Sequence, residues 1–114
     1  MPAYSSSIHA ESFQPDPELG GEAQVFREDD DVVAGLYRFL EPREPFPYAY
    51  EQNETILVLE GSVRIEVEGG PTLDLGPGDV ASMVAGSTAT WHIVAVPFKE
   101  LFVLSASSVA PPIV

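Results

Sequence analysis

Apolar and polar residues alternate in short runs along most of the chain. Alternation of this kind, rich in β-branched and aromatic residues, predicts β-strands. Glycine and proline punctuate the runs, and "VEGG" at 67–70 predicts a hairpin turn. Almost no helical period is present, so the pattern predicts an all-β sandwich or barrel. The expected strands cover residues 32–40, 48–50, 55–60, 62–68, 72–75, 80–84, 90–96 and 100–105.

The other segments are predicted to be irregular. Residues 1–22 are rich in Ser, Pro, Gly and acids and are expected to form an arm with a short strand around Ser7–Phe13. The charge run at 27–31 predicts a solvated turn. Three prolines at 41–47 predict a loop, because proline cannot donate a ladder hydrogen bond. We therefore expect an arm at 1–22, one β domain at 23–108 and an extended tail at 109–114.

Composition narrows the function classes. A chain of 114 residues suits one domain. The absence of cysteine excludes disulfides and thiolate chemistry. A net charge of −13 disfavours nucleic acid and anionic membranes as partners. Neither a signal peptide nor a membrane-spanning stretch is recognisable, and we expect a cytoplasmic protein.

Two motifs carry a resemblance to the cupin superfamily, whose first motif is G-x5-H-x-H-x(3,4)-E-x6-G. The register Tyr48-x-Tyr50-x3-Glu54-x6-Gly61 keeps its spacing, its glutamate and its last glycine. The second motif is G-x5-P-x-G-x2-H-x3-N. Here Gly78-x5-Val84-x-Gly86-x2-Ala89-x3-Ile93 keeps both glycines and loses the proline, histidine and asparagine.

The resemblance spans roughly residues 32–105 and narrows to a subgroup with ethanolamine-utilisation-type and ureidoglycine-aminohydrolase-like members. Its mark is Thr90-Trp91 after an Ala-Gly turn, followed by the basic residue Lys99. It implies a double-stranded β-helix, which is a jelly-roll barrel with an internal cavity. Cupins share this fold across isomerases, dioxygenases, hydrolases, lyases and binding proteins, so the fold alone names no activity.

The positions that bind metal in many cupins carry unusual residues here. By resemblance the four ligands would be Tyr48, Tyr50, Glu54 and Ala89. Alanine has no donor atom, and a phenol stays protonated until about pH 10. One carboxylate does not make a transition-metal site. His92 is expected to point outward by strand alternation, and His9 lies in the arm. We therefore expect neither a metal nor another cofactor.

The same alternation predicts a cavity shared by Tyr48, Tyr50, Glu54 and Trp91, with Ile56 and Val58 as its floor. Aromatic faces with polar tips suit a small organic metabolite. Glu54, enclosed by rings, is the candidate general acid or base, with Tyr48 and Tyr50 as further catalytic candidates.

Arg38 is a candidate for binding an anionic group, although alternation does not settle its facing. Arg64 and Lys99 are expected at the surface. Leu57 and Leu59 should face away from the cavity, so either the arm or a second subunit covers them. We expect a homodimer.

Three functions remain open from the sequence. The first is a metal-free cupin that binds a small metabolite, with acid/base chemistry such as isomerisation, cyclisation or elimination. The second is a metal-dependent hydrolase or dioxygenase with an unusual ligand set. The third is a non-catalytic sensor or interaction module, in which the inward aromatic residues serve only as core and the cavity is too small for a ligand.

Overall fold

Two long strands organise the fold. The computed structural model describes residues 2–106, in which β5 (Asn53–Val67) and β8 (Thr88–Ser105) pair antiparallel from Asn53 opposite Ser105 to Val67 opposite Ala89. Each strand is long enough to take part in two layers. Around them lie β1 (Gln14–Pro15), β2 (Glu22–Glu28), β3 (Val32–Phe39), β4 (Phe46–Ala49), β6 (Thr72–Leu75) and β7 (Val80–Met83).

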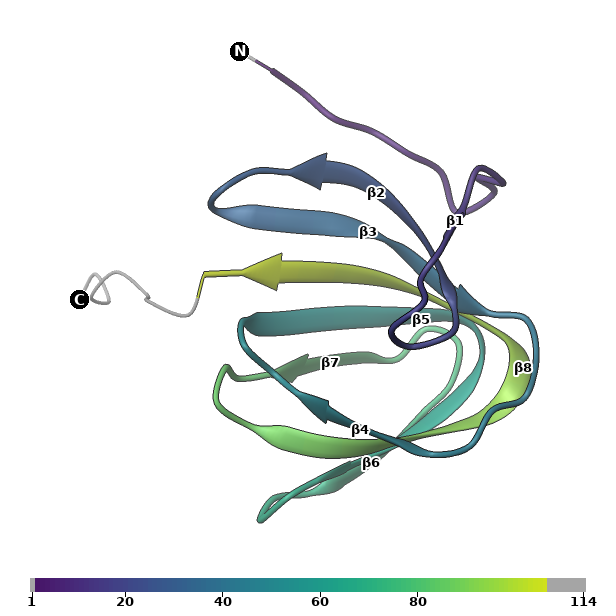
Figure 1. The fold of residues 1–114 in the computed structure, drawn as a ribbon, viewed down its shortest axis with the longest axis vertical. Helices are drawn as coiled ribbons and strands as arrows, with labels where there is room; N and C mark the ends of the chain where they lie inside the picture. Colours follow the sequence, from purple (N-terminus) through teal and green to yellow (C-terminus); the bar gives the residue numbers. More distant parts are fainter. Residues whose placement is uncertain (1, 107–114) are drawn as a thin grey trace.

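The pairing partners define two facing layers (Figure 1). In one layer, the first part of β5 and the last part of β8 are flanked by β7 on one side and by β3, β2 and β1 on the other. In the other layer, the remaining halves of β5 and β8 are flanked by β6 and β4. The all-β prediction and the double-stranded β-helix are thereby confirmed.

Side chains facing inward from both layers form the core. Alternate residues of β5 are buried, and the most enclosed side chains of the described chain include Ile56, Val58, Val63 and Ile65. From β8, Phe98 packs into the same cluster. Burying a side chain of this size stabilises the fold by about 1.5–3 kcal/mol. The period-two pattern therefore identified the inward face of these strands correctly.

The structure corrects the expected strand boundaries in the middle of the chain. The strands expected at 55–60 and 62–68 merge into the single strand β5, which ends one residue earlier at Val67, and those at 90–96 and 100–105 are parts of the single strand β8. Gly61 does not end β5; the strand passes through it with register shifts that let it bend between layers. The predicted turn at 67–70 is confirmed, since the Gly70 N–H donates to the carbonyl of Val67 at 3.0 Å.

The first half of the chain differs more from expectation. The strand expected around Ser7–Phe13 is wrong, because these residues form no strand and β1 follows them at Gln14–Pro15. The sequence reading missed β2, whose mixed polar and apolar residues show no clean alternation but complete the ladder of β3. The loop predicted at 41–47 is wrong at its end, where β4 begins at Phe46. An edge strand tolerates Pro47, because one of its sides needs no hydrogen bonds.

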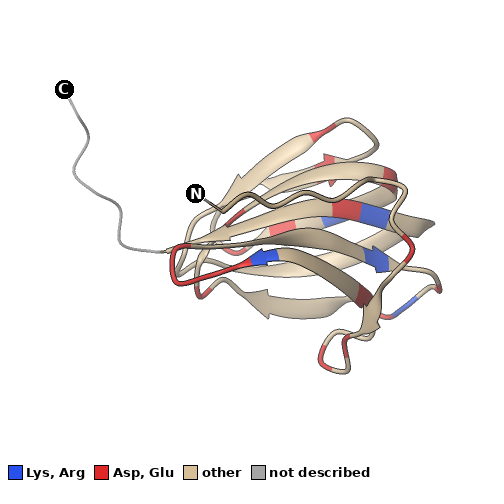
Figure 2. Cartoon of the chain, turned by 90° about the horizontal axis from the view of Figure 1, so that it is seen from above, with Lys and Arg blue, Asp and Glu red and all other residues tan. Residues whose placement is uncertain are grey.

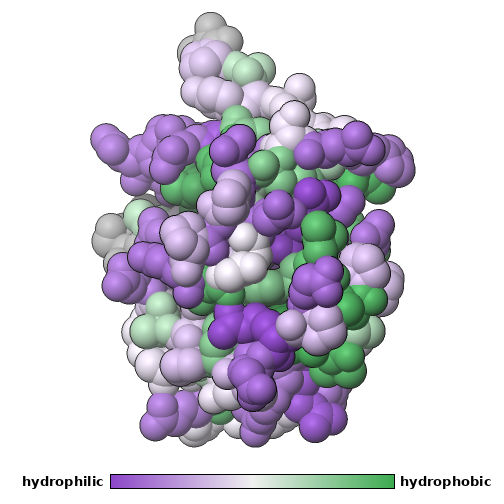
Figure 3. All heavy atoms as spheres, turned by 45° about the vertical axis from the view of Figure 1, so that its right-hand side comes forward, coloured by the Kyte–Doolittle hydropathy of each residue, from purple (hydrophilic) through white to green (hydrophobic). Residues whose placement is uncertain are grey.

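The arm lies across the outer face of β2, β3 and β8. The Lys99 ammonium donates to the carbonyl of Ile8 at 2.9 Å, and the Arg38 guanidinium lies 3.9 Å from the ring centre of Phe13. Leu57 and Leu59, on the outer face of β5, are partly buried. On the face in Figure 3, apolar residues lie among hydrophilic ones. The homodimer stays a prediction.

The boundaries expected for the arm, the β domain and the tail agree only in part with the structure. Glu22, placed in the arm, is the first residue of β2. The tail at 109–114 lies outside the described residues. Within 2–106 the chain forms no helix that is long and apolar enough to cross a membrane.

The bend at Gly61 yields a test. Gly61 has φ 71°, and a Cβ there would lie 2.4 Å from the carbonyl oxygens of Ala95 and Pro97. We expect Gly61→Ala to lower the free energy of unfolding by about 2–4 kcal/mol, because backbone strain and steric overlap add. Gly69 is the matched control, since it has φ 72° and open space around it. Gly69→Ala should cost only about 1 kcal/mol. Equal losses in urea denaturation would contradict the role given to Gly61.

Candidate functional site

A cavity of about 350 Å³ opens between the two layers. Its wall comes from β2, β3, β4, β5, β8 and the turn that follows β1. The volume is at the lower end of the range for small-molecule sites. The lining residues share a pattern, in that aromatic rings and carboxylic acids dominate: Asp16, Glu18, Leu19, Ala23, Tyr37, Phe39, Phe46, Pro47, Tyr48, Ala49, Glu54, Trp91, Glu100, Phe102 and Leu104.

One wall is aromatic because β4 and β8 present their inward residues side by side. Phe46 lies opposite Trp91 in the register, and their rings stack with centroids 6.0 Å apart. Tyr48 lies opposite Ala89, whose small side chain leaves room for the phenol ring. The Trp91 indole N–H donates to the Tyr50 hydroxyl at 2.8 Å. This bond holds the indole plane in place and satisfies its only polar atom.

Glu54 is the buried acid predicted from the motif. It is 6% exposed and projects from β5 into the cavity. Its Oε1 has no hydrogen-bond partner among the described residues. Burial raises the pKa of this carboxyl to about 7, against a smaller opposing effect of the Tyr48 hydroxyl. At neutral pH Glu54 is therefore divided between its two protonation states.

A second buried acid, Glu100, was missed by the sequence reading. It is 3% exposed, lies on β8 and lines the same cavity. Burial, reinforced by the charge of Glu54, raises its pKa well above the usual range. The signal was present, since Glu100 alternates in phase with the apolar Phe98 and Phe102 and so had to face inward.

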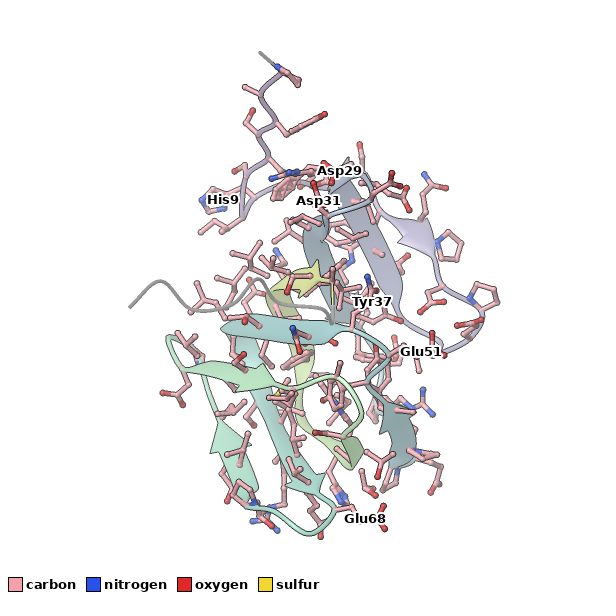
Figure 4. All side chains as sticks on the ribbon, turned by 90° about the vertical axis from the view of Figure 1, so that its left-hand side faces the viewer. His9, Asp29, Asp31, Tyr37, Glu51 and Glu68 are labelled. Carbon is pink, nitrogen blue, oxygen red and sulfur yellow. The ribbon has the colours of Figure 1, made fainter. Side chains whose placement is uncertain are left out.

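Tyr37 is a further polar residue of the cavity that the sequence reading did not single out. Its hydroxyl donates to Asp16 Oδ2 at 2.6 Å and accepts from the Gly21 N–H at 3.2 Å. Figure 4 shows Tyr37 in the middle of the molecule, on the strand below the turn that carries Asp29 and Asp31. These bonds attach the turn at 16–21 to β3, and through Asp16, Glu18 and Leu19 this turn forms part of the cavity wall.

The structure brings together only part of the predicted site. Tyr48, Glu54 and Trp91 line the cavity, whereas Tyr50 lies behind the wall as the hydrogen-bond partner of Trp91. The predicted floor residues Ile56 and Val58 belong to the core and do not line the cavity.

Arg38 does not line the cavity either. Its guanidinium donates to Glu22 at 2.8 Å on the outer face of β3, next to Phe13. The expected outward facing of His92 and Arg64 is confirmed, since they pair with Glu66 and Asp74 respectively.

The side chains at the cupin ligand positions do not fit a tightly held transition metal. Ala89 offers no donor atom. The Tyr50 hydroxyl already accepts the indole N–H of Trp91, and burial raises the pKa of both Tyr48 and Tyr50 and keeps them protonated. In residues 2–106 no three His, Cys, Asp or Glu side chains are grouped as an ion would require. We therefore assign no chemistry to a metal here.

Solved structures that share this architecture include cupins. KdgF from Halomonas sp. matches with a TM-score of 0.68 and 21% identity over 83% of this chain and 87% of that chain. An ethanolamine utilization protein Q from Salmonella typhimurium LT2 matches with a TM-score of 0.69 and 19% identity, over 84% and 80%. The cupin domain of Cnp3 from Schizosaccharomyces pombe gives 0.74 and 12%, over 90% and 73%. At these identities the likeness shows the fold.

The fold and the two motif regions define the chain as a cupin. More narrowly, residues 45–100 match the family model described as EutQ-like cupin domain. The chain is a member of the RmlC-like cupin superfamily, as the resemblance of its motifs predicted. No curated protein matches it by sequence.

The buried acid makes stability depend on pH. The pKa of Glu54 rises from 4.5 to about 7 on folding. The folded state therefore keeps this proton longer than the unfolded state, and the free energy of unfolding falls as pH rises through that window. Glu54→Gln removes this titration. We expect the variant to match the parent near pH 4 and to be more stable at pH 8 by about 2–3 kcal/mol.

Urea denaturation across pH 4–8 measures this difference. The control is Glu51→Gln, an exposed acid in the turn between β4 and β5 (Figure 4). This variant should follow the parent at every pH. A Glu54→Gln variant that is less stable than the parent at pH 8 would show that Glu54 is held as a favourable, partnered anion.

Proposed function

We propose that this cupin binds a small metabolite in its cavity and acts on it without a transition metal, through proton exchange at Glu54. The single observation that carries the proposal is the orphaned Glu54 Oε1, buried at a cavity that has room for a ligand. A buried polar atom without a partner costs about 1–3 kcal/mol. Proteins tolerate that cost where a ligand, a water or a reaction uses the atom.

The surroundings of Glu54 support an acid/base role. A pKa of about 7 places both its proton-donating and its proton-accepting form within reach at neutral pH. Tyr48 stays protonated because burial, followed by the charge of Glu54, raises its pKa. A protonated phenol beside the carboxylate is a donor for an oxygen that becomes negative during the reaction. Isomerisation, cyclisation or elimination of a small metabolite can be catalysed with these two elements.

The alternatives from the sequence fit the site less well. A metal-dependent hydrolase or dioxygenase would need ligands that the cupin positions do not offer. A non-catalytic module with a core filled by aromatic residues would leave no space, whereas the cavity measures about 350 Å³. A cytoplasmic location and a homodimer remain part of the proposal.

A fragment screen tests ligand binding. Trp91 is the only tryptophan of the chain and lines the cavity, so its indole N–H gives one amide-region NMR signal that reports occupancy. We expect several small polar fragments to shift this signal. Ala23 on β2 lines the cavity and is the register neighbour of Tyr37 on β3, and Ala23→Phe should abolish the shifts by filling the space. The control Val94→Phe, at an exposed position of β8, should keep them. A screen without a single fragment that depends on the cavity would refute the proposal.

Elemental analysis tests the metal-free part. Protein purified without chelator should contain Mn, Fe, Ni and Zn well below one ion per chain, because the donor set is too poor to retain them. The matched sample is the Glu54→Gln variant. One stoichiometric ion in the parent that is lost in the variant would replace this proposal with the metal-dependent one.

A further inference from the structure

The acidic residues of the cavity wall have no basic counterpart among the described residues. Asp16, Glu18, Glu54 and Glu100 line the cavity, and no lysine, arginine or histidine of the described residues does. Figure 2 shows acidic positions along strands and at turns throughout the fold, with few basic ones. The net charge of −13 reinforces this local field. A low-dielectric cavity focuses such a field and concentrates cations.

The same acids act on the buried groups of the wall, in addition to the larger effect of burial. The pKa of Tyr48 is raised first by burial and then by the charges of Glu54, Glu100 and Glu51. Glu100 is affected in the same direction by Glu54. No basic group among the described residues lines the wall, so an anionic ligand would find no positive charge to pair with there.

The rest of the wall suits an organic cation. Rings of Tyr37, Phe39, Tyr48 and Trp91 line the cavity. Aromatic faces attract ammonium and guanidinium groups, most strongly where water is excluded. The chain itself places a cation on such a ring at the edge of the site, since the Arg43 guanidinium lies 4.1 Å from the ring centre of Phe46.

Arg43, the cation at this edge, lies outside the cavity wall and is held there by backbone carbonyls. Its Nη1 donates to the carbonyl of Leu19, and its Nε donates to the carbonyl of Glu44 at 2.9 Å. These bonds use two of its five N–H donors on backbone carbonyls, and Arg43 does not line the cavity.

Resting on the proposed function, we infer that the metabolite is a small organic cation, an amine carried as its ammonium form on an apolar body. The ammonium group takes the orphaned Oε1 of Glu54 as its acceptor, with Glu100 as the neighbouring acid, and the apolar body lies against the aromatic wall. Two side chains face Glu54, namely Tyr48 from β4 and Glu100 from β8. Neither of them is basic, so the bound ammonium group would be the only positive charge among these three side chains.

Matched probes separate charge from shape. One set is 2-phenylethylammonium, 2-phenylethanol and 3-phenylpropanoate, and a smaller set is butylammonium, butanol and butyrate. Each is titrated against the Trp91 indole signal at pH 7.5. In at least one set we expect the ammonium to bind about tenfold or more tightly than the alcohol, and the carboxylate more weakly than the alcohol.

Variants locate the preference. In Glu54→Gln the ammonium probe should lose its advantage over the alcohol while the alcohol still binds, which shows that the cavity is intact. Glu51→Gln removes the same charge from an exposed position and should keep the advantage. Calorimetry in two buffers of different ionisation enthalpy should show proton release when the ammonium binds, because a cation favours the ionised form of Glu54. The Glu54→Gln variant should release less.

Each contrary result has a distinct meaning. Alcohols or carboxylates that bind as well as the ammonium would overturn the cation inference and leave the proposed function standing. A preference that Glu51→Gln removes as fully as Glu54→Gln would also overturn it, because the attraction would then come from net charge alone. If no probe of either set binds, the inference fails, and the fragment screen decides whether the proposed function fails with it.

Discussion

The pairing of β5 with β8 is the constraint on which the rest of the structure depends. Both strands run through both layers, so one ladder positions the core, the aromatic wall and the two buried acids at once. Gly61 lets β5 pass from one layer to the other where a side chain would meet the backbone of β8. The cavity lies between the layers that this bend brings face to face, and its shape follows from the ladder.

That geometry explains how the site departs from other cupins without losing the fold. Strand alternation still aims the motif positions inward, whichever residues occupy them. With phenols at Tyr48 and Tyr50 and alanine at Ala89, the inward side chains form an aromatic wall joined by the Trp91–Tyr50 hydrogen bond. The acids that remain have no basic residue beside them in the described part of the wall. The proposed ligand charge rests on this imbalance, and the proposed chemistry rests on the orphaned Oε1 of Glu54.

Stability and function are coupled through the same acids. Burial of Glu54 and Glu100 costs free energy when they ionise, and the fold bears this cost with a core of fully buried apolar side chains. A bound cation would relieve the cost by giving the carboxylates a partner, so binding would stabilise the folded chain. The turn at 16–21 contributes two more acids to the cavity wall, and the hydrogen bond from Tyr37 attaches this turn to β3.

The sequence by itself determined the all-β class, the inward facing of Glu54 and Trp91, and the poor fit to a metal, because these follow from two-residue periodicity, motif spacing and donor chemistry. Strand alternation in the sequence also places Glu100 on the inward face, although its part in the site became clear only from its burial in the structure. Tertiary structure alone decided the strand β2, the fusion of four expected strands into two, and the outward position of Arg38. The strands depend on which segment pairs with which, and the position of Arg38 depends on its contacts with the distant Glu22 and Phe13. No local sequence pattern encodes contacts between segments so far apart in the chain.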